Sequence, residues 1–381
     1  MENIKVMTVF GTRPEAIKMA PLVLELEKRE GVDSIVCVTA QHREMLDSVL
    51  EIFGISPDYD LNIMKKSQSL SSITSGVLLG IDGVLKEAKP DMVLVHGDTS
   101  TTFAGALSAF YHQIPVGHVE AGLRTYDLYS PFPEEANRRL VSELSCLNFA
   151  PTRSNADNLR RENVFGKTVV TGNTAIDALK FTIRPDFKFY TKELLDIDFE
   201  KERIILVTAH RRENYGEPLE NIMNALKAIA ESHSDTTVIY PVHLSPVVTE
   251  TAGRILGGIP NVKLTPPLNT DEMHNLMSRC YMVMTDSGGL QEEAPALGKP
   301  VLCMRRETER PEAVDAGTVK LCGVEKEVIV SMANELLDDP AAYGKMARAV
   351  NPYGDGEASR RICGAILHHF GRGGETDEFQ G

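Results

Sequence analysis

The chain has 381 residues and a mass of 41.9 kDa, about two and a half times a typical single-domain length, so two domains are expected. With 42% hydrophobic and 25% charged residues, it has the composition of an ordinary globular protein rather than of a disordered, collagenous or coiled-coil chain. The formal net charge of −14 disfavours nucleic acid and anionic membranes as general partners. An anionic ligand would need cations or helix N-termini gathered in one place.

The N-terminal residues enter a short apolar run without a basic segment or a small-residue cleavage site. No run approaches the roughly 18 apolar residues of a membrane helix, so we expect a soluble, cytoplasmic protein. The six cysteines are scattered with no Cys-x-x-Cys pair, which favours reduced core thiols over disulfides or a metal cluster. They are Cys37, Cys146, Cys280, Cys303, Cys322 and Cys363.

Short β-rich runs alternate with helical patterns along the chain, which predicts parallel α/β sheets. In the first half, strands are predicted at residues 4–10, 34–39, 92–96, 115–119, 146–150 and 168–171. Helices are predicted between them at 14–30, 43–53, 70–88, 101–111 and 134–144. In the second half, strands are predicted at 203–208, 237–241, 262–265, 281–285, 300–304 and 319–322, with helices that include 218–232 and 271–277.

The predicted fold class is therefore α/β, with two Rossmann-like doubly wound parallel-sheet domains and a cleft between them. We place the domains at residues 1–172 and 173–356, because the sixth strand ends there and strand periodicity resumes later. A turn cluster at 351–356 precedes a final helix, assigned to 357–371. Residues 372–381 are predicted to form a disordered tail.

Ligands of open parallel sheets bind beyond the carboxyl ends of the strands, so polar residues that follow strands are candidate ligand contacts. The first strand leads into GTRPEAIK at 11–18, a glycine turn with a proline at the helix start and two cations, Arg13 and Lys18. Arginine beside a helix N-terminus favours an anion site, and the alternative is an ordinary turn with surface charges. In the second half, DSGG at 286–289 offers paired glycines and the Ser287 hydroxyl to a diphosphate, unless the glycines serve turn geometry alone.

Carboxylates also follow strands of the first half: Asp98 in HGDT, Glu120 in EAG, and Glu134 beside Glu135 in PFPEE. Three such acids on one domain indicate proton transfer, although each alone could be a helix cap. In the second half, AHRREN at 209–214 places an imidazole and two guanidinium groups after a strand. A histidine there can change its protonation state or bind phosphate, and the strand-end position favours such a role over a salt-bridged surface loop. His243 has the same kind of placement with fewer charged neighbours.

No G-x-G-x-x-G fingerprint follows the first strand, so a nicotinamide dehydrogenase is unsupported. The ten histidines show no metal-ligand spacing, and no catalytic metal is predicted. The residues by themselves indicate two domains that close on a nucleotide diphosphate, with carboxylates for acid/base chemistry. Whether the sugar is transferred, hydrolysed or rearranged stays open at this point.

Several ordered motifs together make the chain resemble the non-hydrolysing UDP-N-acetylglucosamine 2-epimerases, from about residue 4 to residue 370. The motifs are FGTRPEA at 10–16, HGDT at 96–99, GHVEAG at 117–122, TDSGG at 285–289, RPEA at 310–313 and NPYGDGEAS at 351–359. The resemblance implies a glycosyltransferase-B (GT-B) type fold whose C-terminal helix crosses back to the first domain. It also implies a homodimer and no external cofactor.

The activity that the resemblance implies is the reversible interconversion of UDP-GlcNAc and UDP-ManNAc. In that family UDP is eliminated across C1 and C2 to give a 2-acetamidoglucal, and UDP then adds back with C2 inverted. The product would supply ManNAc for a surface glycan. Two alternatives remain: a GT-B glycosyltransferase that passes the sugar to an acceptor, and a binding protein without catalysis, which would leave the three acids unexplained.

The resemblance also assigns residues to roles. The catalytic group is Asp98, Glu120, Glu134 and His210. The residues that would hold the UDP-sugar are Arg13, Lys18, Ser287, Gly288, Gly289, Glu293 and Arg310. A second, activating UDP-GlcNAc would contact Gln41, Glu134, Arg211 and His243. Glu44 and Ser67 stand where some members have Gln and Arg, so activation through that second site is left open.

Overall fold

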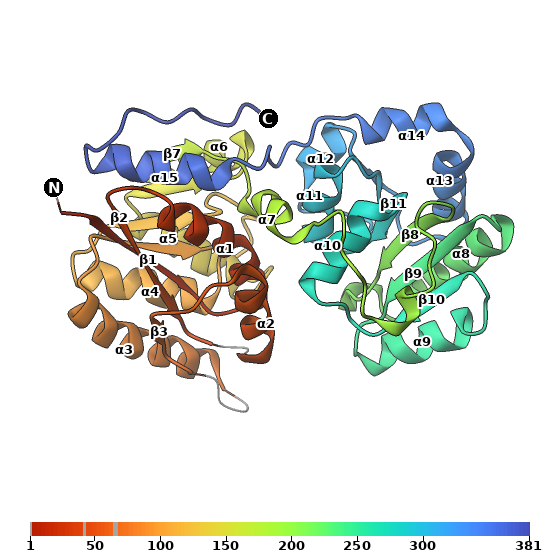
Figure 1. Ribbon diagram of the computed structural model, residues 1–381, viewed down its shortest axis with the longest axis horizontal. Coiled ribbons are helices and arrows are strands. Elements are labelled where there is room, and N and C mark those ends of the chain that lie inside the picture. Colours follow the sequence, from red (N-terminus) through yellow and green to blue (C-terminus); the bar gives the residue numbers. More distant parts are fainter. Residues whose placement is uncertain (1, 41–42, 64–67) are drawn as a thin grey trace. The chain divides into compact units, whose positions relative to one another are not determined.

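The computed structural model describes residues 2–40, 43–63 and 68–381, and of residues 43–45 only the backbone. It divides into two compact units, and each unit is an α/β structure built on one parallel sheet (Figure 1). Unit 1 comprises Met1–Phe181 and Tyr353–Gly381, and unit 2 comprises Thr182–Pro352. Among the described helices, none combines the length and apolar character that crossing a membrane requires.

The sheet of unit 1 has seven strands in the order β3-β2-β1-β4-β5-β6-β7, all of them parallel. The strands are β1 (Ile4–Phe10), β2 (Val32–Val38), β3 (Tyr59–Asp60), β4 (Met92–His96), β5 (Val116–Val119), β6 (Leu147–Ala150) and β7 (Lys167–Val170). The helices are α1 (Arg13–Glu27), α2 (Arg43–Phe53), α3 (Leu70–Ala88), α4 (Ser100–Tyr111), α5 (Glu134–Leu144), α6 (Arg153–Arg161), α7 (Thr174–Thr182) and α15 (Ala358–His369).

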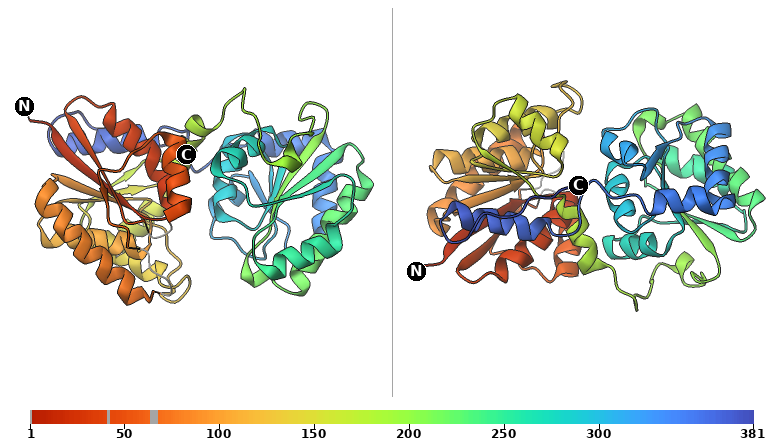
Figure 2. Two further views of the ribbon diagram at one scale, coloured as in Figure 1. Left: turned by 60° about the horizontal axis from the view of Figure 1, so that its bottom comes forward. Right: turned by 90° about the horizontal axis from the view of Figure 1, so that it is seen from above.

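Helices cover both faces of this sheet, as the two views of Figure 2 show. On β1, Val6 and Phe10 join the core cluster that contains α1 and α15, whereas Met7 and Val9 join the cluster that contains α3 and α4. Successive side chains of a strand point to opposite faces, so a strand covered on both faces reads as one continuous apolar run. That run is what made β1 predictable.

The sheet of unit 2 has six parallel strands in the order β10-β9-β8-β11-β12-β13. The strands are β8 (Arg203–Thr208), β9 (Thr236–Pro241), β10 (Val262–Thr265), β11 (Met282–Thr285), β12 (Val301–Cys303) and β13 (Val319–Leu321). The α-helices are α8 (Glu217–Ser232), α9 (Pro246–Leu256), α10 (Thr270–Arg279), α11 (Gly288–Ala296), α12 (Pro311–Asp315), α13 (Lys326–Asp338) and α14 (Pro340–Ala347), and 3₁₀ turns lie at η1 (Lys192–Leu194) and η2 (Arg212–Asn214).

The two doubly wound parallel sheets of the predicted fold class are confirmed, and each predicted strand lies within two residues of an observed one. The first sheet has one strand more than predicted, because β3 has only two residues and carries no periodicity of its own. The first segment of unit 1 ends at Phe181, whereas the sequence predicts the domain boundary at residue 172. Helix α7, except for its last residue, stays with unit 1, where its Asp177 accepts the N–H groups of Ala358 and Ser359.

The C-terminal tail makes ordered contacts, which differs from the disorder expected for residues 372–381. Phe379 is 8% exposed and packs with the core around β7, and its N–H donates to the carbonyl of Val170 at 2.9 Å. Asp377 accepts from Arg360 at 2.8 Å and from Arg361 at 3.2 Å. Phe379 and Asp377 thus hold the tail in place, although the composition of residues 372–381 predicts a disordered segment.

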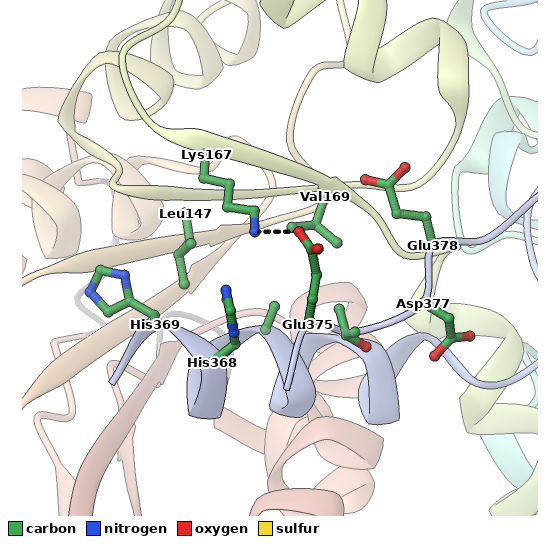
Figure 3. A pocket seen from close by; sticks show the side chains of 10 residues that line it. Leu147, Lys167, Val169, His368, His369, Glu375, Asp377 and Glu378 are labelled. Atoms are coloured by element: carbon green, nitrogen blue, oxygen red, sulfur yellow. Dashed lines mark hydrogen bonds and ion pairs between the residues drawn. The ribbon is translucent and has the colours of Figure 1, made fainter. Parts of the chain in front are cut away.

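Between this tail, α15 and strands β6 and β7 lies a cavity of about 720 Å³ (Figure 3). Lys167 on β7 and Glu375 in the tail form an ion pair of 3.2 Å across it. The tail therefore lies along β7, the last strand of the sheet, and covers part of an edge that would otherwise offer unpaired backbone groups.

Candidate active site

The loop between β1 and α1 is organised by Glu15, a buried carboxylate that is 3% exposed. Its Oε2 accepts the N–H groups of Gly11 (2.9 Å) and Thr12 (2.7 Å), and Thr12 in turn caps α1, which completes a capping box. Its Oε1 accepts the hydroxyls of Thr99 (2.6 Å) and Thr102 (3.2 Å) at the start of α4. Glu15 therefore fixes the ends of two strands relative to each other, directly beside Arg13.

Glu120 lies just beyond β5 with a φ of +63°, a conformation that non-glycine residues rarely adopt. Its Oε1 contacts Lys18 Nζ and accepts from Asn173 Nδ2 at 3.3 Å, while its Oε2 lies 3.2 Å from His96 Nε2. Burial lowers the pKa of His96 to about 4, against the opposing effect of Glu120, so this imidazole is neutral at physiological pH. Lys18, predicted to hold the UDP-sugar, thus directly contacts a predicted catalytic acid.

Asp98 follows β4 and is held from helix α5. Arg138 Nη2 donates to its Oδ2 at 2.6 Å, and Asn137 Nδ2 donates to its carbonyl at 2.9 Å. Burial raises the pKa of Asp98, and the charges of Glu120 and Glu134 add to the rise, while Arg138 opposes it. Glu120 and Glu134 therefore lie close enough to Asp98 for their charges to act on it, as expected of carboxyls that share one proton-transfer site.

Glu134 is the first residue of α5, and its neighbour Glu135 has a different task. Glu135 is fully buried and accepts the N–H groups of Thr125 (3.0 Å) and Tyr126 (3.1 Å), which fixes the loop that precedes the helix. Glu134 is half-buried in the first turn of α5. Arg138 comes four residues after Glu134, and this spacing places both side chains on one face of α5. The spacing is a sequence signal from which Arg138 could have been predicted as a site residue.

In unit 2, the predicted phosphate loop forms the N-terminal end of α11. If Gly288 carried a Cβ atom, that atom would lie 3.6 Å from Arg310 Nη2 and 3.9 Å from Arg211 Nη2. Two guanidinium groups therefore lie over the first turn of α11. Ser287 precedes the helix, and its side chain makes no capping hydrogen bond. Glu293, one turn into the helix, faces Gly289: its Oε1 would lie 3.8 Å from a Cβ atom at that position. Helix N–H groups, two cations and a hydroxyl suit a diphosphate.

Two imidazoles lie near this helix end. The rings of His210, after β8, and His243, after β9, stack with centroids 5.4 Å apart and planes 12° from parallel. The side chain of His210 is 40% exposed. Its pKa is lowered, chiefly by burial and also by the charges of His243 and Arg211, whereas Asp286 raises it.

The structure thus groups the predicted residues within each unit. Unit 1 brings together Lys18, Asp98, Glu120 and Glu134, with Arg13 at the neighbouring helix start. Unit 2 brings together Arg211, Gly288 and Arg310, with His210 stacked on His243. Of the positions assigned to a second ligand, Gln41 lies outside the described residues. Of the two positions that depart from the family pattern, Ser67 also lies outside them, and Glu44 is described by its backbone alone.

Sequence reasoning missed three side chains that organise these groups, namely Glu15, Arg138 and Asp286. The capping spacing of Glu15 with Thr12 and the helical spacing of Arg138 from Glu134 were available as signals. Within residues 2–40, 43–63 and 68–381, no group of three or more His, Cys, Asp or Glu side chains is placed to hold a metal ion.

Comparison with known proteins settles the family. A family model described as UDP-N-acetylglucosamine 2-epimerase matches residues 24–367. The chain belongs to the UDP-N-acetylglucosamine 2-epimerase family. The Bacillus subtilis protein of that description is 56% identical over 383 residues, which cover 100% of both chains.

Solved structures of similar proteins carry the same fold. A Listeria monocytogenes protein is 51% identical, with a TM-score of 0.93 over 99% of each chain. The UDP-GlcNAc 2-epimerase of Neisseria meningitidis, solved with UDP-GlcNAc bound, is 50% identical with a TM-score of 0.85 over 96% of this chain and 100% of that one. The epimerase family and its GT-B type fold of two Rossmann-like domains are thereby confirmed for this chain.

Proposed function

We propose that this epimerase interconverts UDP-GlcNAc and UDP-ManNAc by eliminating UDP and adding it back, without hydrolysis. The observation that carries the proposal is the carboxyl cluster of Asp98, Glu120 and Glu134, in which the charges of the other two acids help to raise the pKa of Asp98. A carboxyl whose pKa is raised can hold a proton nearer to neutral pH and pass it on. The ligand of the Neisseria relative supports the substrate.

The proposed reaction balances without a redox partner. A carboxylate removes the proton from C2, the C2–H electron pair forms the C1–C2 double bond, and the C1–O bond breaks, so that UDP leaves with that bonding pair. A carboxylic acid then returns a proton to the opposite face of C2, while an oxygen of UDP attacks C1. Atoms and electrons return to an isomer of the starting compound, and no external cofactor is needed.

The leaving group is a diphosphate, so cations must stabilise the charge that develops as the C1–O bond breaks. We assign this task to Arg310, His210 and the N-terminal end of α11, with Arg13 and Lys18 contributing from unit 1. Ser287, Gly288 and Gly289 supply hydroxyl and backbone donors. Glu293 is assigned to the ribose hydroxyls, as carboxylates serve in other nucleotide sites.

Three finer points rest on the family resemblance and are part of the same proposal. The enzyme works as a homodimer, its product supplies ManNAc for a surface glycan, and Arg211 and His243 contact a second UDP-GlcNAc. The stacking of His243 on His210 supports the last point, because it would connect a second ligand to the diphosphate side of the first.

The deciding experiment is NMR of the purified enzyme with UDP-GlcNAc in deuterated water and no acceptor. We expect deuterium to enter C2 while a UDP-ManNAc signal grows. If turnover instead required an acceptor and the C2 proton were retained, the chain would be a GT-B glycosyltransferase. A chain that bound the nucleotide sugar and produced neither change would be a binding protein.

A further inference from the structure

Asp286 is a carboxylate in unit 2 that the proposed reaction does not use. It follows β11 directly and is 0% exposed. Its Oδ2 accepts the N–H groups of His210 and Arg211, both at 2.8 Å, and the side-chain amide of Asn214 at 3.2 Å. This oxygen therefore fixes the loop after β8.

The other oxygen of Asp286 faces an imidazole. Among the described residues Oδ1 has no hydrogen-bond partner, and it lies 3.5 Å from His210 Nδ1. A buried carboxylate oxygen without a donor is costly, so the imidazole that faces it indicates its function. An ionised carboxylate only accepts hydrogen bonds, and it therefore favours the tautomer that carries a proton on Nδ1.

The ring of His210 is restrained on a second side by the stacked ring of His243. The charged groups near the ring are Asp286 at its Nδ1 side, His243 on its face, and Arg211 next along the chain. With Nδ1 directed at Asp286, Nε2 is the nitrogen left for a ligand. Two of these neighbours disfavour an imidazolium, and Asp286 alone stabilises one.

We propose that Asp286 is a positioning residue: it holds His210 in the Nδ1–H tautomer and stabilises its protonated form when a diphosphate binds. On binding, His210 takes up one proton at Nε2 and donates it in a hydrogen bond to a phosphate oxygen, while Nδ1–H stays directed at Asp286. The assignment of a diphosphate to this imidazole rests on the proposed function. The assignment of the tautomer does not depend on the proposed function.

The tautomer is measured by ¹⁵N NMR of the full chain labelled at histidine, with the His210 signals assigned by their loss in His210→Gln. We expect Nδ1–H in the wild type. In Asp286→Asn the amide can turn its NH₂ toward Nδ1, and we expect the tautomer to change to Nε2–H. A wild-type enzyme in the Nε2–H form would overturn the proposal, whether or not the variant folds.

The protonation is measured by calorimetry of UDP binding in buffers of different ionisation enthalpy. Near pH 7 the wild type should take up a proton on binding UDP, and Asp286→Asn should take up markedly less and lose at least about tenfold in kcat. Unchanged proton uptake in the variant would contradict the proposal. If the wild type failed to bind UDP, the proposed function would fail, while the tautomer result would still stand.

Tyr240→Phe is the matched control. The Tyr240 hydroxyl donates to the carbonyl of Ala209, so its loss loosens the same loop without touching the imidazole. We expect the Nδ1–H tautomer and the proton uptake to persist in this variant. A tautomer change here as large as in Asp286→Asn would mean that loop anchoring alone sets the ring, and it would overturn the specific role of Oδ1.

Discussion

Lys18 and Glu120 form an ion pair that joins helix α1 to the residue just after β5, and both side chains are largely buried. Breaking a buried pair by removing one charge leaves the other uncompensated. We predict that Glu120→Gln lowers kcat by roughly 10²-fold or more, because the variant has lost a proton-transferring group. Steady-state turnover of UDP-GlcNAc checks this.

Glu357→Gln is the control for that variant. Glu357 pairs with Lys180 at 2.6 Å in the same unit, but both side chains are exposed, and an exposed pair contributes at most about 1 kcal/mol. Its turnover should match the wild type. Equal turnover in both variants would remove Glu120 from the proposed mechanism.

Asp98 predicts a specific dependence of stability on pH. Its pKa is raised in the folded state, mainly by burial, so the folded state favours the protonated form. The stability that the neutral form provides is therefore present below the ordinary carboxyl pKa and is lost as pH rises toward the folded pKa. Asp98→Asn, which stays neutral, should become more stable relative to the wild type between about pH 4 and pH 7.5.

Urea unfolding at both pH values measures that difference in free energy, and kcat measured alongside should fall by roughly 10²-fold. A difference in unfolding free energy that stays constant with pH would show that Asp98 titrates alike in the folded and unfolded chain. Such a result would also weaken its assignment as a proton carrier near neutral pH.

The position of Arg310 predicts that its guanidinium binds the diphosphate of UDP. Its guanidinium lies over the first turn of α11 and also contacts Glu292 through Nε. Arg310→Lys keeps the charge near Glu292 but loses the planar fork, so we predict about 10-fold to 100-fold weaker UDP binding with little change in Tm. Calorimetry gives the Kd.

Arg306→Lys serves as the comparison, because Arg306 is exposed and pairs with Glu325 at 3.1 Å. Its UDP affinity should stay at the wild-type value. If Arg310→Lys also bound UDP like the wild type, the guanidinium groups would lie near the helix end without contacting phosphate.

Phe379 tests whether the C-terminal tail stabilises unit 1. Burying a phenylalanine contributes about 1.5–3 kcal/mol, so Phe379→Ala should lower the free energy of unfolding by roughly that amount. Phe165→Ala removes a ring that is 94% exposed and should change it little. Chemical denaturation compares the two, and equal stabilities would mean that the tail does not contribute to the core.

The fold was largely predictable because its strands are buried on both faces and read as short apolar runs between helical patterns. The candidate site could be proposed from sequence where a polar residue follows a strand, as Asp98, Glu120 and His210 do. It was less predictable where a side chain acts on a distant one. Arg138 contacts Asp98 across 40 positions, and local periodicity carries no record of such a pairing.

Asp286 shows a different limit. It lies inside the DSGG motif, in which the glycines and the serine predict a phosphate loop and nothing in the sequence marks the aspartate. Only its complete burial and its contacts to residues 210, 211 and 214 separate it from an ordinary turn residue. Those properties depend on the packing of two strand ends that lie far apart in sequence.

The contacts of Glu15 limit which substitutions this protein can accept during evolution. One carboxylate accepts hydrogen bonds from the loop after β1 and from the start of α4, so neither segment can vary alone without leaving donors unsatisfied. Substitutions at residues 12, 15, 99 and 102 should therefore be inherited as a set. An engineer who transplants one of these segments into another scaffold would have to move the other with it.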